Sequence, residues 1–207
     1  MKRVTRRQSH EPNAYSFGFG LYVYKRVGKK KVLVYSNPDD PPARAWIDFL
    51  YTHSRYTELP AYTSLDITNT LRGMNYNMTP TVLAAVGETN KGVVLGTGSA
   101  PPALSQYSLG ALVAHGTGSG QLFYKVQDMG YPIYAVNGPQ KNMRFLQNVR
   151  AVENKHTSPL RIFEVGLYVF TSALYSWMFA RDVVPDGILF EPGDEYFFNY
   201  RMEIPLP

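Results

Sequence analysis

Proline and glycine recur throughout this 207-residue chain and leave little room for long helices. The sequence holds 15 prolines and 17 glycines, spread along its whole length rather than gathered in one linker. Both residue types end helices and mark turns, whereas strands of roughly three to ten residues fit between them. Segments that read as strands recur from residue 81 onward, at 81–86, 93–95, 109–114, 121–126, 143–152, 160–170, 175–184 and 196–204. This spacing predicts an all-β chain, mainly an antiparallel β-sandwich or a jelly-roll-like arrangement.

The last of these segments has the clearest strand pattern. Apolar residues occupy the even positions from Tyr196 to Ile204, and the odd positions between them are mostly polar. A period of two is that of a strand with one buried face. The preceding Glu191-Pro192-Gly193-Asp194 predicts a tight turn, around which Glu191, Asp194 and Glu195 are expected to be solvated acids rather than a catalytic pair.

The N-terminal part predicts a hairpin followed by one short helix. Residues 14–27 and 32–35 are rich in β-branched and aromatic residues and flank a predicted turn at 28–31. The aromatic positions change parity after Phe19, which indicates a bulge or a strand covered on both faces. In 43–53, Ala43, Trp46, Ile47 and Leu50 have the spacing of one helical face. We therefore divide the chain into a basic arm, hairpin and helix packed on the body (1–60) and a sandwich body (61–207).

The positive charge is concentrated at the N-terminal end. Residues 1–31 hold nine lysines and arginines and one acid, a local charge of +8; the whole chain carries +5, so the remainder carries −3. Such a basic end favours contact with an acidic protein surface, DNA or RNA, or head-to-tail association of identical chains. A solvated terminus and a lysine-capped turn are the alternative. The residues expected to contact a protein partner are Lys2, Arg3, Arg6, Arg7, Lys29, Lys30 and Lys31.

Residues that would carry chemistry are missing or wrongly spaced. The chain has no cysteine, and its four histidines do not have metal-ligand spacing. The glycine-rich pieces 96–99 and 116–120 lack the lysine of a phosphate loop, so we expect them to be turns. The sequence therefore predicts no enzyme, no cofactor and no metal. Without an apolar run of about 18 residues, it also predicts a soluble protein with no membrane span and no export signal.

Aromatic residues are dense in the first hairpin. Tyr15, Phe17, Phe19, Tyr22 and Tyr24 could in principle stack on sugars or bases. Packing in the core or against another subunit is the favoured interpretation of this group.

Three segments, taken in order, resemble the virion structural proteins of tailed bacteriophages. The first is Val93-Val94-Leu95-Gly96-Thr97-Gly98-Ser99-Ala100-Pro101-Pro102, followed by Tyr107-Ser108-Leu109. The second is Glu164-Val165-Gly166-Leu167-Tyr168-Val169, after a strand and a turn. The third is Met178-Phe179-Ala180-Arg181-Asp182-Val183-Val184-Pro185, followed by the turn at 191–194 and the final strand. Order and spacing are similar across residues 81–207, whereas the first 60 or so residues have no counterpart.

The resemblance implies a non-enzymatic building block of a phage particle, made in the host cytoplasm and located in the virion. Such a β-sandwich would decorate the capsid, form part of the neck or tail, or anchor a fibre, with identical subunits and other virion proteins as partners and no membrane. It implies a tight turn at Gly96 and Gly98 and a central strand at 164–169. It also implies that Arg181 and Asp182 lie where a strand leaves the core, where we expect a surface ion pair. A receptor- or carbohydrate-binding module and a nucleic-acid-binding accessory protein are the alternatives.

Overall fold

The computed structural model describes residues 18–40, 43–55, 62–74, 80–101, 103, 105–130, 134–135, 142–171 and 174–205. Antiparallel sheets and a single short helix make up these residues, which confirms the predicted all-β fold. The elements are β1 (Gly18–Val27), β2 (Lys30–Asp40), α1 (Arg44–Arg55), β3 (Tyr62–Leu65), β4 (Leu71–Met74), β5 (Pro80–Thr81), β6 (Gly92–Gly96), β7 (Phe123–Gly130), β8 (Tyr134–Ala135), β9 (Asn142–Glu153), β10 (Leu160–Thr171), β11 (Ser176–Phe190) and β12 (Glu195–Pro205).

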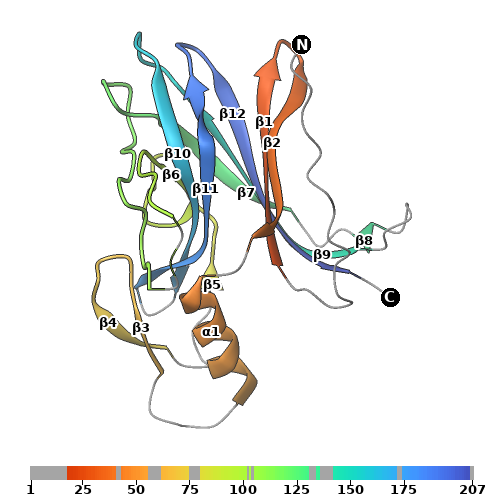
Figure 1. Cartoon of the computed structure of the whole chain (residues 1–207), viewed down its shortest axis with the longest axis vertical. Helices are drawn as coiled ribbons and strands as arrows, with labels where there is room; N and C mark the ends of the chain where they lie inside the picture. The colour runs from red at the N-terminus through yellow and green to blue at the C-terminus, as the bar shows by residue number, and fades with distance from the viewer. Residues whose placement is uncertain are drawn as a thin grey trace.

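Two sheets form the sandwich, with α1 and the β3–β4 hairpin at one end (Figure 1). The larger sheet has the order β2-β1-β12-β9-β7, with β8 beside β9, and the smaller has β11-β10 with β5 and β6 along the other side of β10. The N-terminal hairpin belongs to the larger sheet, because β1 pairs with the C-terminal strand β12. The segment 164–169 lies in β10, between β11 and β6, as the expected central strand.

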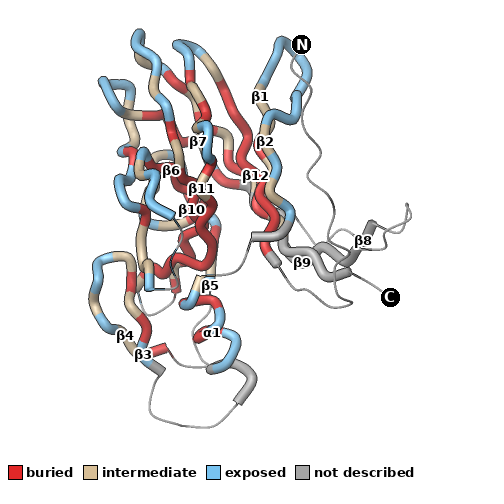
Figure 2. The backbone as a smooth tube through the Cα atoms, viewed as in Figure 1, coloured by how far each residue is buried: buried red, intermediate tan, exposed pale blue. Residues whose placement is uncertain are grey.

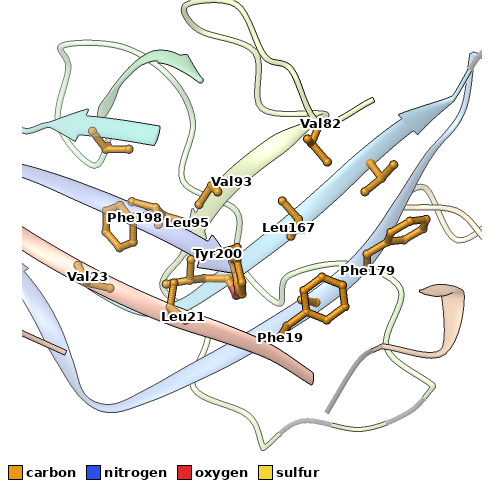
Figure 3. Packing of buried hydrophobic residues seen from close by; sticks show 14 of the residues in the cluster. Phe19, Leu21, Val23, Val82, Val93, Leu95, Leu167, Phe179, Phe198 and Tyr200 are labelled. Atoms are coloured by element: carbon orange, nitrogen blue, oxygen red, sulfur yellow. The ribbon is translucent and has the colours of Figure 1, made fainter. Parts of the chain in front are cut away.

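The core fills the space between the two sheets (Figures 2 and 3). Burial of each large apolar side chain stabilises the fold by about 1.5–3 kcal/mol, so this cluster supplies the main driving force for closing the sandwich. It joins Phe19, Leu21 and Val23 of β1 to Val93 and Leu95 of β6, Leu167 of β10, Trp177 and Phe179 of β11, and Phe198 and Tyr200 of β12.

The final strand β12 is buried on both faces rather than one. Tyr196, Phe198 and Tyr200 face the core, as the alternation predicts. Phe197 and Asn199 are buried as well, because β12 lies inside the sheet between β1 and β9 and side chains of neighbouring strands cover its outer face. The period of two thus identified the strand and the side chains that face the core. It did not predict that side chains of neighbouring strands would bury the other face as well.

The β1–β2 hairpin has a tighter turn than the sequence predicts. Val27 pairs with Lys30, which leaves Gly28 and Lys29 as a two-residue loop. Gly28 has a φ of +59°, the conformation of the first central residue of a type II′ turn. The predicted four-residue turn at 28–31 is therefore wrong. Of the two explanations for the change of aromatic parity after Phe19, the structure supports a strand covered on both faces, because Phe19 is in the core and Tyr22 is half-buried on the other face. β1 pairs with β12 without a register shift, and the irregularity between β1 and β2 places its extra residue in β2.

The helix is present, but its buried face differs from the prediction. Trp46 is buried as expected, together with Phe49, whereas Ile47 and Leu50 are exposed. The reason is aromatic packing: the ring of Trp46 lies 5.1 Å from that of Phe179, and the ring of Phe49 lies 5.4 Å from it, centroid to centroid. These contacts to β11 set the rotation of α1.

Two predicted strands are not formed as expected. Of 81–86, only Thr81 belongs to a strand, and 109–114 forms only a single bridge at Leu112. The second segment lies antiparallel to the end of β6 only around this bridge, where the Thr97 N–H donates to the Ala111 carbonyl oxygen (2.9 Å) and the Val113 N–H to that of Leu95 (2.8 Å). Side chains bind two of its other backbone groups, since the N–H of Leu109 donates to the Tyr168 hydroxyl (2.8 Å) and that of Ala111 to the Glu164 carboxylate (3.1 Å).

Candidate functional site

Two lysines at the hairpin turn face solvent. Lys29 and Lys30 are exposed and form no ion pair with a described residue. Lys31, the third residue expected to contact a partner, has its Nζ 3.7 Å from the centroid of the Phe197 ring. This cation–π contact attracts the Lys31 side chain to β12. The structure therefore leaves the charges of Lys29 and Lys30 available to a partner.

Two further bases of the hairpin bind acids next to β12. Lys25 Nζ donates to Asp194 at 2.6 Å, and this hydrogen bond raises the pKa of Lys25. Arg26 Nε lies 2.5 Å from Glu195, which also accepts a 2.5 Å hydrogen bond from Lys125 of β7. The expectation that Asp194 and Glu195 are merely solvated is wrong, because they connect neighbouring strands of the larger sheet.

Other residues named from the sequence fall into three environments. Lys2, Arg3, Arg6 and Arg7, together with Tyr15 and Phe17, lie outside the described residues, and Phe19 is in the core. Tyr22 and Tyr24 are half-buried on the outer face, where Arg201 covers them. Its guanidinium carbon lies 4.1 Å from the Tyr22 ring centroid, and its Nη2 donates to the Tyr24 hydroxyl at 3.1 Å. These tyrosines pack within the sheet.

Among the described strands, β2 is the outermost of the larger sheet and pairs only with β1. Three consecutive apolar residues on it are about half exposed, Val32 (46%), Leu33 (49%) and Val34 (48%), and Val27, which pairs with Lys30 beside the turn, is 56% exposed. This end of the hairpin is pale blue in Figure 2. Consecutive residues of a strand point to opposite faces, so apolar surface is exposed on both sides of the hairpin end.

A groove of about 340 Å³ runs between this edge and the second half of β11. Val34 and Tyr35 line one wall, and Val184 to Leu189 line the other. Further along, Asn37 Nδ2 donates to Asp182 Oδ1 at 2.8 Å and holds the two sheet edges together. The groove has a mixed lining that includes Arg161 and Asp186, and it shares Val34 with the exposed apolar run. Sequence reasoning missed this edge because it cannot say which strand lies outermost.

A buried ion pair lies on the smaller sheet, on the face that points away from the core between the two sheets. Nε and Nη2 of Arg181 each lie 2.8 Å from Glu164 Oε2, and both side chains are almost fully buried. The expected surface ion pair at Arg181 is therefore wrong. Glu164 Oε1 accepts hydrogen bonds from the backbone N–H groups of Gly98 (3.0 Å) and Ala111 (3.1 Å).

The three resembling segments meet at this ion pair. Glu164 comes from the second segment, Arg181 from the third, and Gly96 and Gly98 from the first. A Cβ at Gly96 would lie 2.6 Å from Glu164 Oε1, and one at Gly98 would overlap the same oxygen. These glycines are needed for room beside a carboxylate as well as for a turn. The sequence contained a signal for this ion pair: Glu164 lies in a predicted central strand, and a buried carboxylate requires a positively charged or hydrogen-bonding partner.

A second buried cation, Arg150 of β9, connects β7 of the larger sheet, β6 of the smaller sheet and the loop at Ala85. Its guanidinium donates to the carbonyl oxygens of Val93 (2.9 Å), Lys125 (3.0 Å) and Ala85 (3.1 Å), and it lies 4.8 Å from the Tyr124 ring. Burial lowers the pKa of Arg150 to about 10, so it stays charged at neutral pH. Carbonyl oxygens satisfy its donors, which makes it a structural cross-link.

Among the described residues, no three histidine, aspartate or glutamate side chains gather where they could hold a metal ion. Within the same ranges, no helix has the length and apolar character to cross a membrane. A comparison with protein-family models, curated proteins and solved structures finds no match for this chain.

Proposed function

We propose that this chain is a structural subunit of a tailed-bacteriophage particle and acts by binding other protein subunits rather than by catalysis. The observation that carries the proposal is β2, the outermost strand of the larger sheet among the described residues, with its three consecutive exposed apolar residues. Contiguous exposed apolar surface rimmed by charge is typical of protein–protein contact sites. The resemblance to virion proteins suggests that the assembly is a phage particle. The three resembling segments contact one another at Glu164 and Arg181, which supports the view that they form one structural unit.

Association at this edge has a clear physical basis. Burying the apolar groups of Val27, Val32, Leu33 and Val34 contributes about 25 cal/mol per Å² removed from water. Lys29 and Lys30 at the rim would steer an acidic partner toward the edge without themselves being desolvated. Identical subunits and other virion proteins are the partners that this chemistry fits.

The alternatives receive less support from the same residues. A nucleic-acid partner requires several free bases, yet Lys25, Arg26 and Lys31 are engaged within the sheet. A carbohydrate site requires open aromatic faces, whereas Arg201 lies over the ring of Tyr22, and both Tyr22 and Tyr24 are partly buried. Both features favour a protein partner.

The basic N-terminal arm is a second contact in this proposal. Residues 2–13 contain Lys2, Arg3, Arg6 and Arg7, and they would bind an acidic surface of a neighbouring subunit. Deleting residues 2–13 should leave the sandwich folded and weaken incorporation into particles. If the shortened chain is incorporated as well as the full chain, residues 2–13 do not contribute a subunit contact and this part of the proposal is refuted.

Quantitative mass spectrometry of purified particles tests the proposal as a whole. We expect the chain in particles at a constant ratio to the major capsid protein, with hundreds of copies indicating the capsid and about six to twelve indicating the neck or tail. Particles that assemble and infect normally without the chain bound would overturn the proposed function.

A further inference from the structure

The larger sheet has a second edge, at the opposite end from β2. Among the described strands, β7 is the last in the order β2-β1-β12-β9-β7. The segment 83–87 runs antiparallel beside β7, since the Gln127 N–H donates to the Ala84 carbonyl oxygen (2.8 Å) and the Gly87 N–H to that of Tyr124 (3.1 Å). This segment therefore forms the outer margin of the sheet on that side.

Both edges expose large apolar side chains. Three residues beside or in β7 are about half exposed, and we call them the β7 patch: Leu83 (48%), Val86 (54%) and Val126 (52%). The four half-exposed residues at the other edge are the β2 patch: Val27, Val32, Leu33 and Val34. Together the two patches offer on the order of 400 Å² of apolar surface, against about 1,600 Å² of total area in a standard interface, of which somewhat more than half is apolar. One contact that covers both patches would thus gain a substantial part of the apolar area that a stable interface needs.

The two patches lie at the same level along the strands. A row of paired residues crosses the sheet from one patch to the other: Leu33, Tyr24, Phe197, Ala151 and the irregularity of β7 that contains Val126. Val86 lies beside the same irregularity, between the hydrogen bonds of Ala84 and Gly87. Packing the two patches together between copies therefore joins their larger sheets without an offset along the strands.

We propose that the β2 patch of one copy of this chain packs against the β7 patch of a second copy. Such a contact is heterologous, because each copy binds one neighbour through its β2 patch and another through its β7 patch. A two-fold contact would use the β2 patch twice and leave the β7 patch in water. The inference rests on the proposed association function, of which it names one partner.

The charges around the patches agree with an apolar partner. Lys29 and Lys30 lie at the turn beside the β2 patch, whereas Glu88 and Lys125 flank the β7 patch and already form ion pairs within the chain. Charged residues are depleted at the centre of protein–protein interfaces, and the rim is polar. An uncharged patch at each edge selects apolar surface as its partner, and this chain supplies that surface at its own opposite edge.

Two single variants, one in each patch, test the contact. Leu33→Glu places a charge in the β2 patch, and Val86→Glu places one in the β7 patch; both positions are exposed, so each variant should fold. Every contact requires one intact patch of each kind. We therefore expect each variant alone to associate with a dissociation constant raised at least about tenfold over wild type, because the added carboxylate would be buried without a partner.

An equimolar mixture of the two variants gives the decisive result. It retains one intact pair of patches, the β7 patch of Leu33→Glu and the β2 patch of Val86→Glu. We expect this pair to form a one-to-one heterodimer with near wild-type affinity that does not grow further, because its two outer patches each carry a charge.

Sedimentation velocity at several protein concentrations measures the molar mass, and native mass spectrometry identifies the composition of each species. Leu71→Glu is the matched control, because Leu71 of β4 is 60% exposed and lies in the hairpin at one end of the sandwich (Figure 1). It should associate as the wild type does. Circular dichroism checks that each variant is folded, and formation of the heterodimer shows it independently.

A wild-type chain that stays monomeric at the highest concentration overturns the contact, as does a mixture that forms no heterodimer. A Val86→Glu variant that associates as the wild type does also overturns it and indicates a two-fold contact through the β2 patch. Failure of the proposed function looks different. A chain that associates through both patches but is missing from purified particles would refute the virion proposal alone.

Discussion

Replacing Arg181 by methionine should remove the cation from the buried pair while keeping most of its volume. Arg181 contributes two contacts of 2.8 Å to Glu164, one of 2.8 Å to Gln106 Oε1 and one of 2.9 Å to the Ala100 carbonyl oxygen. The variant leaves the fully buried Glu164 carboxylate with only the N–H groups of Gly98 and Ala111 as donors. Breaking a buried pair in this way costs about 3–5 kcal/mol.

That loss is large against the total stability of a domain, about 5–15 kcal/mol. For a chain of this size it corresponds to a fall in Tm of about 6–20 °C, since 1 kcal/mol shifts Tm by roughly 2–4 °C. Urea unfolding followed by tryptophan fluorescence and by circular dichroism measures it. Lys91→Met is the matched control, because its pair with Glu88 (3.0 Å) is partly exposed and should be worth less than about 1 kcal/mol.

The double variant Glu164→Gln with Arg181→Met sharpens the test. It removes both buried charges, and the glutamine oxygen still accepts from Gly98 and Ala111. We therefore expect it to be destabilised by clearly less than the sum of the two single variants. A cost for Arg181→Met as small as that for Lys91→Met, or strict additivity in the double variant, would refute the reasoning.

Three more perturbations follow from single residues. Gly28→Ala should cost about 1–2 kcal/mol in urea unfolding through the left-handed backbone alone, because nothing lies within 4 Å of the added methyl group; a cost as small as that of Gly28→Asn would contradict this. Burial raises the pKa of Tyr168 to about 12, so the unfolded chain ionises first and stability should fall as pH rises from about 10 to 12; a Tyr168→Phe variant with the same alkaline dependence would speak against this. The pKa of Asp66 is lowered, because hydrogen bonds from Thr68 and Thr70 outweigh desolvation by burial. Stability from Asp66 is therefore present above about pH 4 and lost below it, and Asp66→Asn should cost about 1–3 kcal/mol at neutral pH and show a weaker acid dependence.

Local features of the sequence determined the fold class and most strands. Frequent proline and glycine disfavour long helices over most of the chain, and alternation from Tyr196 to Ile204 marks a strand because successive side chains point to opposite faces. Local signals of the same kind predicted the hairpin and the short helix. They act between near neighbours in the chain, so no knowledge of the tertiary structure is needed to find them.

Contacts between residues far apart in the chain decided the rest. The rotation of α1 depends on Phe179, more than 120 residues away. In 109–114, the N–H groups of Leu109 and Ala111 bind the side chains of Tyr168 and Glu164 rather than a strand. Arg181 is buried for a similar reason, since its partner comes from the neighbouring strand β10. The same holds for the candidate site. The sequence was enough to predict the lysines at the hairpin turn, but not the exposed edge beside them. Whether β2 is an edge depends on strand order, which is set only when β1 pairs with the C-terminal strand β12.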